Sequence, residues 1–134
     1  MIEERILTKD EFDSLLDSAP ESETRNLKRI LGSNAYDYLM NNTKEISGIV
    51  NSRPIYFGAL SKENQLWTIV NSDVKEQFSL YKISKRRVYK WLDKYGVIYA
   101  TMEKVNLKNI LWTIKLGFKK IKEDLTTITF KLGG

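Results

Sequence analysis

The sequence predicts an α+β fold in which a mixed, mostly antiparallel sheet is flanked by helices. Three observations lead to this prediction. Three apolar segments between residues 45 and 70 are separated by short turns, and short turns join antiparallel strands. Residues 97–118, VIYATMEKVNLKNILWTIKLGF, change from strand periodicity to helix periodicity and back. Helical patterns also precede and interrupt these segments, and such helices pack on a sheet to build one core.

Residues 1–42 predict a short strand and three helices. The strand covers residues 4–7. Thr8 then opens the first helix as a capping box with Glu11, in which each side chain accepts from the backbone N–H of the other residue. A second helix is expected over residues 22–31, between a proline and a glycine. A third, short helix follows and ends at a pair of asparagines.

Three strands and a basic helix are predicted for the middle of the chain. The strands cover residues 45–50, 55–60 and 65–70, and the turns between them favour an antiparallel meander. A loop is expected over residues 71–84. An amphipathic helix is expected over residues 84–95, with its valine, tryptophan and leucine turned toward the core.

The last third of the chain predicts a strand, a helix and two further strands. Residues 97–102 alternate between two faces, as a strand of a sheet does. Asn106 caps the helix and Gly117 ends it. The closing strands cover residues 118–122 and 126–131. The helix is expected to turn four apolar residues inward, namely Leu107, Ile110, Leu111 and Ile114.

Residues 97–118 resemble the C-terminal half of the GCN5-related N-acetyltransferase (GNAT) fold. In that family a splayed strand precedes a helix that begins at asparagine and ends at Gly-Phe, and Asn106, Gly117 and Phe118 fall at this spacing. The element order also agrees along nearly the whole chain, so the resemblance implies one GNAT-like domain over residues 1–134. The chemistry departs from the family, because Thr113 stands where many members have a tyrosine that acts as general acid.

The last half of the chain resembles a narrower group, the small internal virion proteins of short-tailed phages. These proteins carry an acetyltransferase-like fold. The stretches that carry the resemblance are QLWTIVNSD, NLKNILWTIKLGF and TTITFKLGG. The resemblance implies a component of the virion or of its assembly or genome-ejection machinery, in the virion interior or the host cytoplasm. The implied partners are other virion or assembly proteins.

Composition removes the commonest catalytic groups. The chain has no histidine and no cysteine, so it lacks the usual general base, a thiolate nucleophile and the commonest metal ligands. Glu45 and Glu63 stand at strand ends and are weak candidates for a base. Tyr56 and Tyr99 are strand aromatics that favour packing. We therefore assign no catalytic residue and expect no metal site.

An active GNAT enzyme holds the pyrophosphate of acetyl-CoA on a glycine-containing loop after the third meander strand. Close approach of backbone N–H groups needs those glycines. The matching stretch here, NSDVKEQFSLYKIS over residues 71–84, has none. The main interpretation is a catalytically degenerate protein that needs no cofactor, and the alternative is an active acetyl-CoA-dependent N-acetyltransferase with a divergent loop. In the alternative, the cofactor contacts are Asn106, Lys82, Ser84, Lys85 and Arg86.

The net charge of +5 is unevenly distributed along the chain. Residues 1–24 hold an acidic excess, and basic residues gather in the helix over residues 84–95. Its basic face predicts an interaction surface for an acidic partner. A solvated helix face is the plainer interpretation, and weak nucleic-acid contact is a third. No apolar run approaches the roughly 18 residues of a membrane-spanning helix. The residues of the predicted interaction face are Lys85, Arg86, Tyr89 and Lys90.

Overall fold

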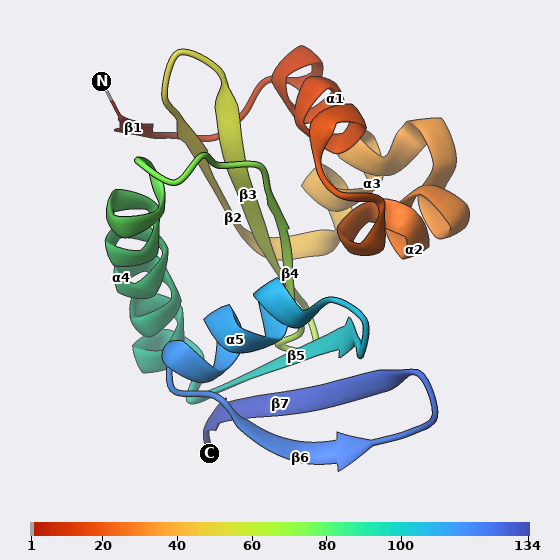
Figure 1. The fold of residues 1–134 in the computed structure, drawn as a ribbon, viewed down its shortest axis with the longest axis vertical. Helices are drawn as coiled ribbons and strands as arrows, with labels where there is room; N and C mark the ends of the chain where they lie inside the picture. Colours follow the sequence, from red (N-terminus) through yellow and green to blue (C-terminus); the bar gives the residue numbers. More distant parts are fainter. Residues whose placement is uncertain (1) are drawn as a thin grey trace.

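The computed structural model describes residues 2–134, without the side chains of residues 22, 23, 26, 30, 31 and 33. The element order agrees with the predicted one (Figure 1). The elements are β1 (Glu3–Glu4), α1 (Lys9–Ser18), α2 (Glu21–Leu31), the short 3₁₀ helix η1 (Gly32–Asn34), α3 (Ala35–Asn42), β2 (Thr43–Val50), β3 (Pro54–Ser61), β4 (Leu66–Val70), α4 (Gln77–Tyr95), β5 (Val97–Glu103), α5 (Leu107–Lys115), β6 (Lys119–Glu123) and β7 (Thr127–Gly133).

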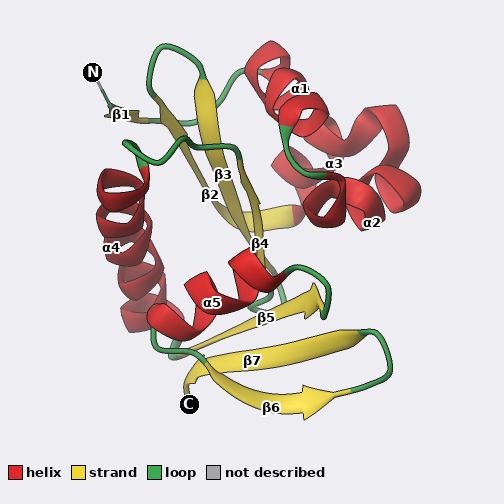
Figure 2. Ribbon diagram, in the orientation of Figure 1, coloured by secondary structure: helices red, strands yellow, loops and turns green. Residues whose placement is uncertain are grey.

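The strands form two antiparallel sheets that meet at one parallel bridge. The first sheet has the order β1-β2-β3-β4 and the second has the order β5-β7-β6. Gln65 and Tyr99 form the bridge, and the Tyr99 N–H donates to the Asn64 carbonyl at 2.8 Å. From this point β4 and β5 diverge toward their C-terminal ends (Figure 2). The predicted mixed, mostly antiparallel arrangement with flanking helices is confirmed.

Helices cover both faces of the first sheet (Figure 2), and β3 is buried at its centre. On one face, Phe57 packs with Phe12 of α1, and the two ring centroids lie 4.9 Å apart. On the other face, Tyr56 packs with Leu80 of α4. Successive strand residues point to opposite faces, so one strand anchors both helical layers. In the described part of the chain, no helix is both long and apolar enough to cross a membrane.

Helix α4 begins at Gln77, well before the predicted start at Ser84. Asp73 and Glu76 form a reciprocal pair of hydrogen bonds in the turn directly before the helix, and the prediction missed this pair. The Glu76 N–H donates to Asp73 Oδ1 at 3.0 Å, and the Asp73 N–H donates to Glu76 Oε1 at 2.9 Å. Leu80 and Ser84 then lie on the buried face of the helix. Half of the predicted loop over residues 71–84 is therefore helical.

Helix α5 turns a different face inward from the predicted one. Leu107 and Leu111 are each 68% exposed and Ile114 is 52% exposed, whereas Thr113 and Leu116 are buried. The helix lies against β5, with the Thr113 hydroxyl 3.7 Å from the sulfur of Met102. The side of the helix that carries Asn109 and Thr113 faces a cavity, so most of the predicted apolar face is exposed to solvent. Of the four residues predicted to turn inward, Ile110 is partly buried in the core.

Gly117 allows α5 and α4 to meet closely. Its φ is +108°, in the left-handed region that favours glycine. A Cβ atom at this position would lie 2.7 Å from the hydroxyl oxygen of Tyr89. That hydroxyl donates to the Leu116 carbonyl at 2.7 Å. The predicted glycine stop is confirmed, and the hydrogen bond from α4 fixes the C-terminal end of α5.

Candidate functional site

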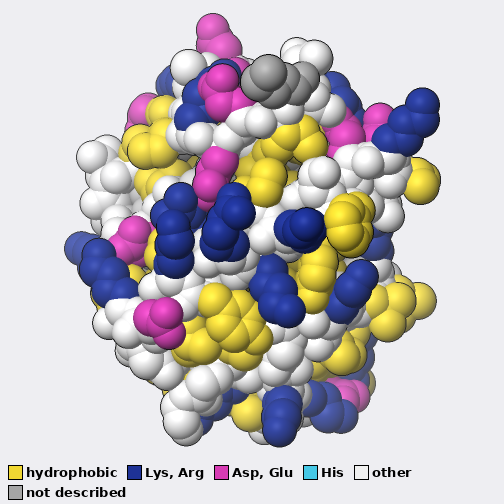
Figure 3. All heavy atoms as spheres, turned by 90° about the vertical axis from the view of Figure 1, so that its left-hand side faces the viewer, with side chains coloured by type: hydrophobic (Ala, Val, Ile, Leu, Met, Phe, Trp, Pro, Cys, Tyr) yellow, Lys and Arg dark blue, Asp and Glu magenta, His cyan; other side chains and the backbone are white. Residues whose placement is uncertain are grey.

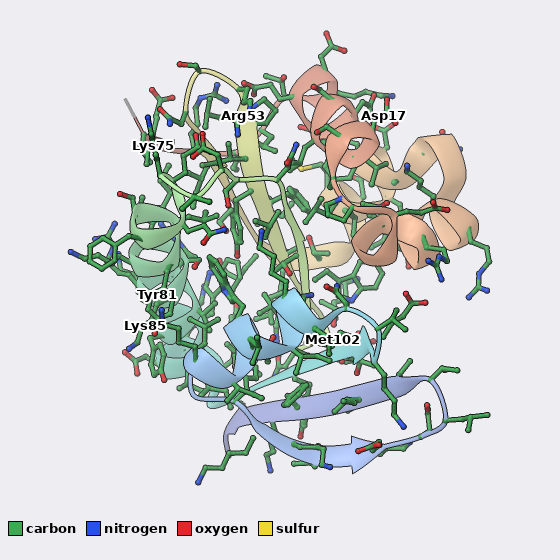
Figure 4. The ribbon with its side chains drawn as sticks, in the orientation of Figure 1. Asp17, Arg53, Lys75, Tyr81, Lys85 and Met102 are labelled. Atoms are coloured by element: carbon green, nitrogen blue, oxygen red, sulfur yellow. The ribbon has the colours of Figure 1, made fainter. Side chains whose placement is uncertain are left out.

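The divergence of β4 and β5 creates a cavity of about 340 Å³. Residues 66–69 of β4 and residues 100–103 of β5 form its walls. Figure 4 places Met102 of β5 next to α5, which covers the cavity from one side. Helix α4 contributes Ser84 and Val88 to the lining, and α5 contributes Asn109, Trp112 and Thr113. The cavity therefore arises between the two sheets, where α4 and α5 line it together with Leu27 of α2 and Leu39 of α3.

Three polar side chains of the cavity lining are hydrogen-bonded within their own helices. The Thr113 hydroxyl donates to the Asn109 carbonyl at 2.8 Å, and the Ser84 hydroxyl donates to the Tyr81 carbonyl at 3.2 Å. The Asn106 side chain accepts from the Asn109 N–H at 3.4 Å, which confirms the predicted cap. Both hydroxyl protons are thus held by backbone carbonyls. Thr113 does not stand ready to protonate a leaving group, as the tyrosine of the family does.

Glu103 is the one acidic residue in the cavity lining. Its Oε1 lies 3.6 Å from Nη1 of Arg25, which comes from α2. Its Oε2 is buried and has no hydrogen-bond partner in the described part of the chain. A carboxylate held in a cleft is a chemically competent general base. The sequence analysis missed this residue. Its position at the end of β5, just before the Asn106 cap, was the available signal.

The predicted base candidates lie elsewhere. Neither Glu45 nor Glu63 lines the cavity. Burial acts to raise the pKa of Glu45, but hydrogen bonds from Tyr95 at 2.6 Å and Lys94 at 2.9 Å outweigh it and lower that pKa. Tyr56 does line the cavity, and its burial raises its pKa, so it stays protonated and packs.

The connection from β4 to α4 is held together by the buried carboxylate of Glu76. Arg53 donates to it through two nitrogens, at 2.9 and 3.1 Å, and Asn51 donates at 2.7 Å. Figure 4 shows Arg53 at the end of the sheet where this connection passes. Burial acts to raise the pKa of Glu76, but the bonds from Arg53, the Asp73 N–H and Asn51 hold it at about 2. Glu76 is therefore an anion at neutral pH.

These residues do not fit a coenzyme A pyrophosphate in the way the family binds it. The Asp73 and Glu76 N–H groups, which such a loop offers to phosphate, are already taken by carboxylate oxygens. The Glu76 carboxylate also occupies the Arg53 guanidinium directly before α4, so this cation is already paired. The cavity between β4 and β5, by contrast, has room for a small acyl group.

The structure separates the five candidate cofactor residues into two groups. Ser84 and Asn106 line the cavity. Lys82, Lys85 and Arg86 are exposed on α4 and do not line it. Figure 3, which faces the α4 side, shows lysine and arginine side chains around exposed hydrophobic ones. Of the predicted interaction face, Lys85, Arg86 and Lys90 are exposed and Tyr89 is half-buried.

No cluster of three metal-binding carboxylates occurs among the described residues.

The sequence matches no protein-family model, and it matches no curated protein sequence. Its structure, however, is similar to several solved structures along the whole chain.

Acetyltransferases are among these similar structures. A GNAT-family acetyltransferase from Bacillus anthracis has a TM-score of 0.69 at 9% identity, covering 98% of this chain and 94% of that one. The PaiA N-acetyltransferase of Thermoplasma acidophilum, in complex with coenzyme A, has a TM-score of 0.67 at 16% identity, covering 100% and 99%. The spermidine N-acetyltransferase of Vibrio cholerae, in complex with CoA and spermine, has a TM-score of 0.66 at 11% identity, covering 98% and 95%.

The diverging strands and these similarities define the class of the molecule: it has the GNAT acetyltransferase fold. This confirms the fold implied by residues 97–118. At 9–16% identity the similarity establishes the fold and not a shared activity.

Proposed function

We propose that this chain is a catalytically degenerate GNAT-fold protein that acts as an interaction component of a phage particle, of its assembly or of its genome ejection. The observation that carries the proposal is the Glu76 carboxylate, buried at the start of α4 and bonded to Arg53, Asn51 and the Asp73 N–H. This carboxylate already accepts hydrogen bonds from a backbone N–H and from a positively charged side chain, the groups that a pyrophosphate site needs.

The lining of the cavity also supports the loss of catalysis. The Thr113 hydroxyl is bonded back to its own helix. The chain has no histidine or cysteine to supply another general acid or nucleophile. The assignment to a phage, with a place in the virion interior or the host cytoplasm, depends on the resemblance of the last half of the chain. On this proposal, virion or assembly proteins are the partners.

Calorimetry with acetyl-CoA and CoA tests the degenerate function. We expect no binding tighter than about millimolar, because the pyrophosphate lacks its backbone donors. The PaiA N-acetyltransferase of Thermoplasma acidophilum, which was solved with coenzyme A, serves as positive control. Micromolar affinity that is lost in Asn106→Ala would contradict the proposal, since Asn106 lines the cavity.

A second candidate function, acetyl-CoA-dependent N-acetylation, is favoured by one observation. Glu103 presents a buried, unpartnered Oε2 in a cavity of about 340 Å³, a suitable position for a base that deprotonates an amine. The test is release of free CoA from acetyl-CoA in the presence of a panel of primary amines. Turnover that is abolished in Glu103→Gln and kept in Glu63→Gln, an exposed control, would establish this function.

A further inference from the structure

The outer face of α4 holds positive charge that the described part of the chain does not neutralise. Lys82, Lys85, Arg86 and Lys90 are exposed, and none of them forms a salt bridge with a described residue. The Nζ atoms of Lys82 and Lys85 lie 5.1 and 5.7 Å from the ring centroids of Phe78 and Tyr81, which are uncharged. Like charges at i, i+4, such as Lys82 and Arg86, destabilise a helix. A partner of opposite charge would remove this repulsion.

The outer face of α1 holds the complementary charge. Asp10, Asp13 and Asp17 follow at i, i+3 and i+7, so they share one side of the helix. Asp10 and Asp17 are exposed and Asp13 is partly exposed. None of the three forms a salt bridge with a described residue. The basic residues nearest to them in sequence pair elsewhere, Arg5 with Glu11 at 2.6 Å and Lys9 with Asp37 at 3.4 Å.

The two faces belong to opposite sides of the molecule. Figure 1 shows α1 on the upper right and α4 on the left, with the first sheet between them. They cannot meet within one chain, but they can meet between two copies. The stripe from residue 10 to 17 is about 10 Å long and the stripe from residue 82 to 90 is about 12 Å long, at the rise of an α-helix. The two stripes are therefore opposite in charge and similar in length, with three acids on one and four bases on the other.

We propose that the basic face of α4 binds the acidic face of α1 of a second copy, head to tail. The inference deepens the proposed function and rests on it for the claim that the chain acts as an interaction component. In a dimer held by two different faces, one copy keeps a free acidic face and the other keeps a free basic face. Further copies can therefore add, until the assembly closes into a ring or continues as an open chain. A contact made of exposed charges weakens with salt.

A second copy fits the basic face better than a nucleic acid does. The chain carries its own set of acids at helical spacing, which form no salt bridge with a described residue. Of the α4 aromatics on this side, Phe78 is exposed, whereas Tyr81 and Tyr89 are engaged within the chain. The Tyr89 hydroxyl donates to the Leu116 carbonyl, and the Tyr81 ring packs edge-on against Trp112 at 5.9 Å. Stacking of successive bases on this surface would need several free aromatic faces, and Tyr81 and Tyr89 do not supply them.

Sedimentation equilibrium of the full chain, in low salt and in about 0.5 M NaCl, tests the inference. In low salt we expect the weight-average mass to rise with concentration to at least twice the 15.6 kDa of the monomer. In high salt we expect the monomer. Lys82→Glu/Arg86→Glu and Asp13→Lys/Asp17→Lys are each expected to stay monomeric in low salt. An equimolar mixture of these two variants is expected to associate, because each supplies the face that the other lacks.

Two controls make the result decisive. Lys119→Glu/Lys122→Glu changes the net charge as the basic-face variant does, but on the exposed strand β6, and it should associate like the parent. Melting curves verify that every variant is folded. A parent that is monomeric at all concentrations, or a mixture that does not associate, overturns the inference. So does binding of a single-stranded DNA oligonucleotide that Lys82→Glu/Arg86→Glu abolishes, in a parent that does not self-associate. None of these results bears on the calorimetry with CoA, so the proposed function is judged separately.

Discussion

Arg53 and Glu76 join the turn after β2 to the start of α4 through two parallel hydrogen bonds. Nη2 donates to Oε1 at 2.9 Å and Nη1 donates to Oε2 at 3.1 Å. Such a bidentate pair fixes geometry as well as charge. Here it fixes an anion of the chain itself directly before α4. On the proposed function, the structural role of Glu76 and the loss of a phosphate site have one cause.

This pair predicts a pH dependence of stability. The pKa of Glu76 is lowered from 4.5 to about 2 in the folded protein, so the ionised form stabilises the fold. That contribution is complete above about pH 4.5 and is lost as the pH falls toward 2. We expect the free energy of unfolding of the parent to fall over this window more steeply than that of Glu76→Gln. Urea denaturation at several pH values measures both, and parallel curves would contradict the prediction.

Removal of Arg53, which pairs with a buried carboxylate, should destabilise the protein more than removal of a lysine from an ion pair in which both side chains are exposed. Arg53→Met leaves the Glu76 carboxylate buried without its cation, and we expect a loss on the order of 1–3 kcal/mol. Lys9→Met breaks the exposed pair with Asp37 and should change stability little. Chemical denaturation at pH 7 compares the two variants. Equal effects would show that the Glu76 cluster does not hold the β4–α4 connection.

The orientation of α5 gives a matched test of packing. Leu116→Ala removes a side chain that is 3% exposed and should cost about 2–5 kcal/mol. Leu111→Ala removes the same atoms from a side chain that is 68% exposed and should change stability by less than about 0.5 kcal/mol. The free energy of unfolding in urea distinguishes the two. A large loss in Leu111→Ala would mean that α5 packs through the face that the sequence pattern suggested.

Local signals made most of the fold predictable from the sequence. The Thr8–Glu11 capping box, the Asn106 cap and the Gly117 stop each depend on residues within one or two turns, and all three are present in the structure. Short turns likewise determined the antiparallel meander. The Asp73–Glu76 pair is equally local, but the family resemblance predicted a loop over these residues.

The candidate site was less predictable because it depends on contacts between distant segments. The inward face of α5 follows from the cavity between β4 and β5, so a count of apolar residues gave the wrong face. The burial of Glu103 likewise depends on Arg25 of α2, and no pattern near residue 103 reveals that contact. Polar groups that line a cavity between elements are difficult to distinguish in sequence from groups that face water.

The predicted interaction face gives the last test. Lys85, Arg86 and Lys90 are exposed and form no salt bridge with a described residue, so reversal of all three to Glu should leave the melting temperature within a few degrees of the parent. On the proposed function, the same change should remove the protein from purified particles, or from its partner in a pull-down, because complementary charge steers and orients the encounter. Reversal of Lys108, Lys119 and Lys122, exposed residues elsewhere on the surface, is the control of equal charge. If the first variant is incorporated as well as the control, the α4 face is only a solvated helix surface, and the binding site must lie on another face, such as the exposed apolar stripe of α5.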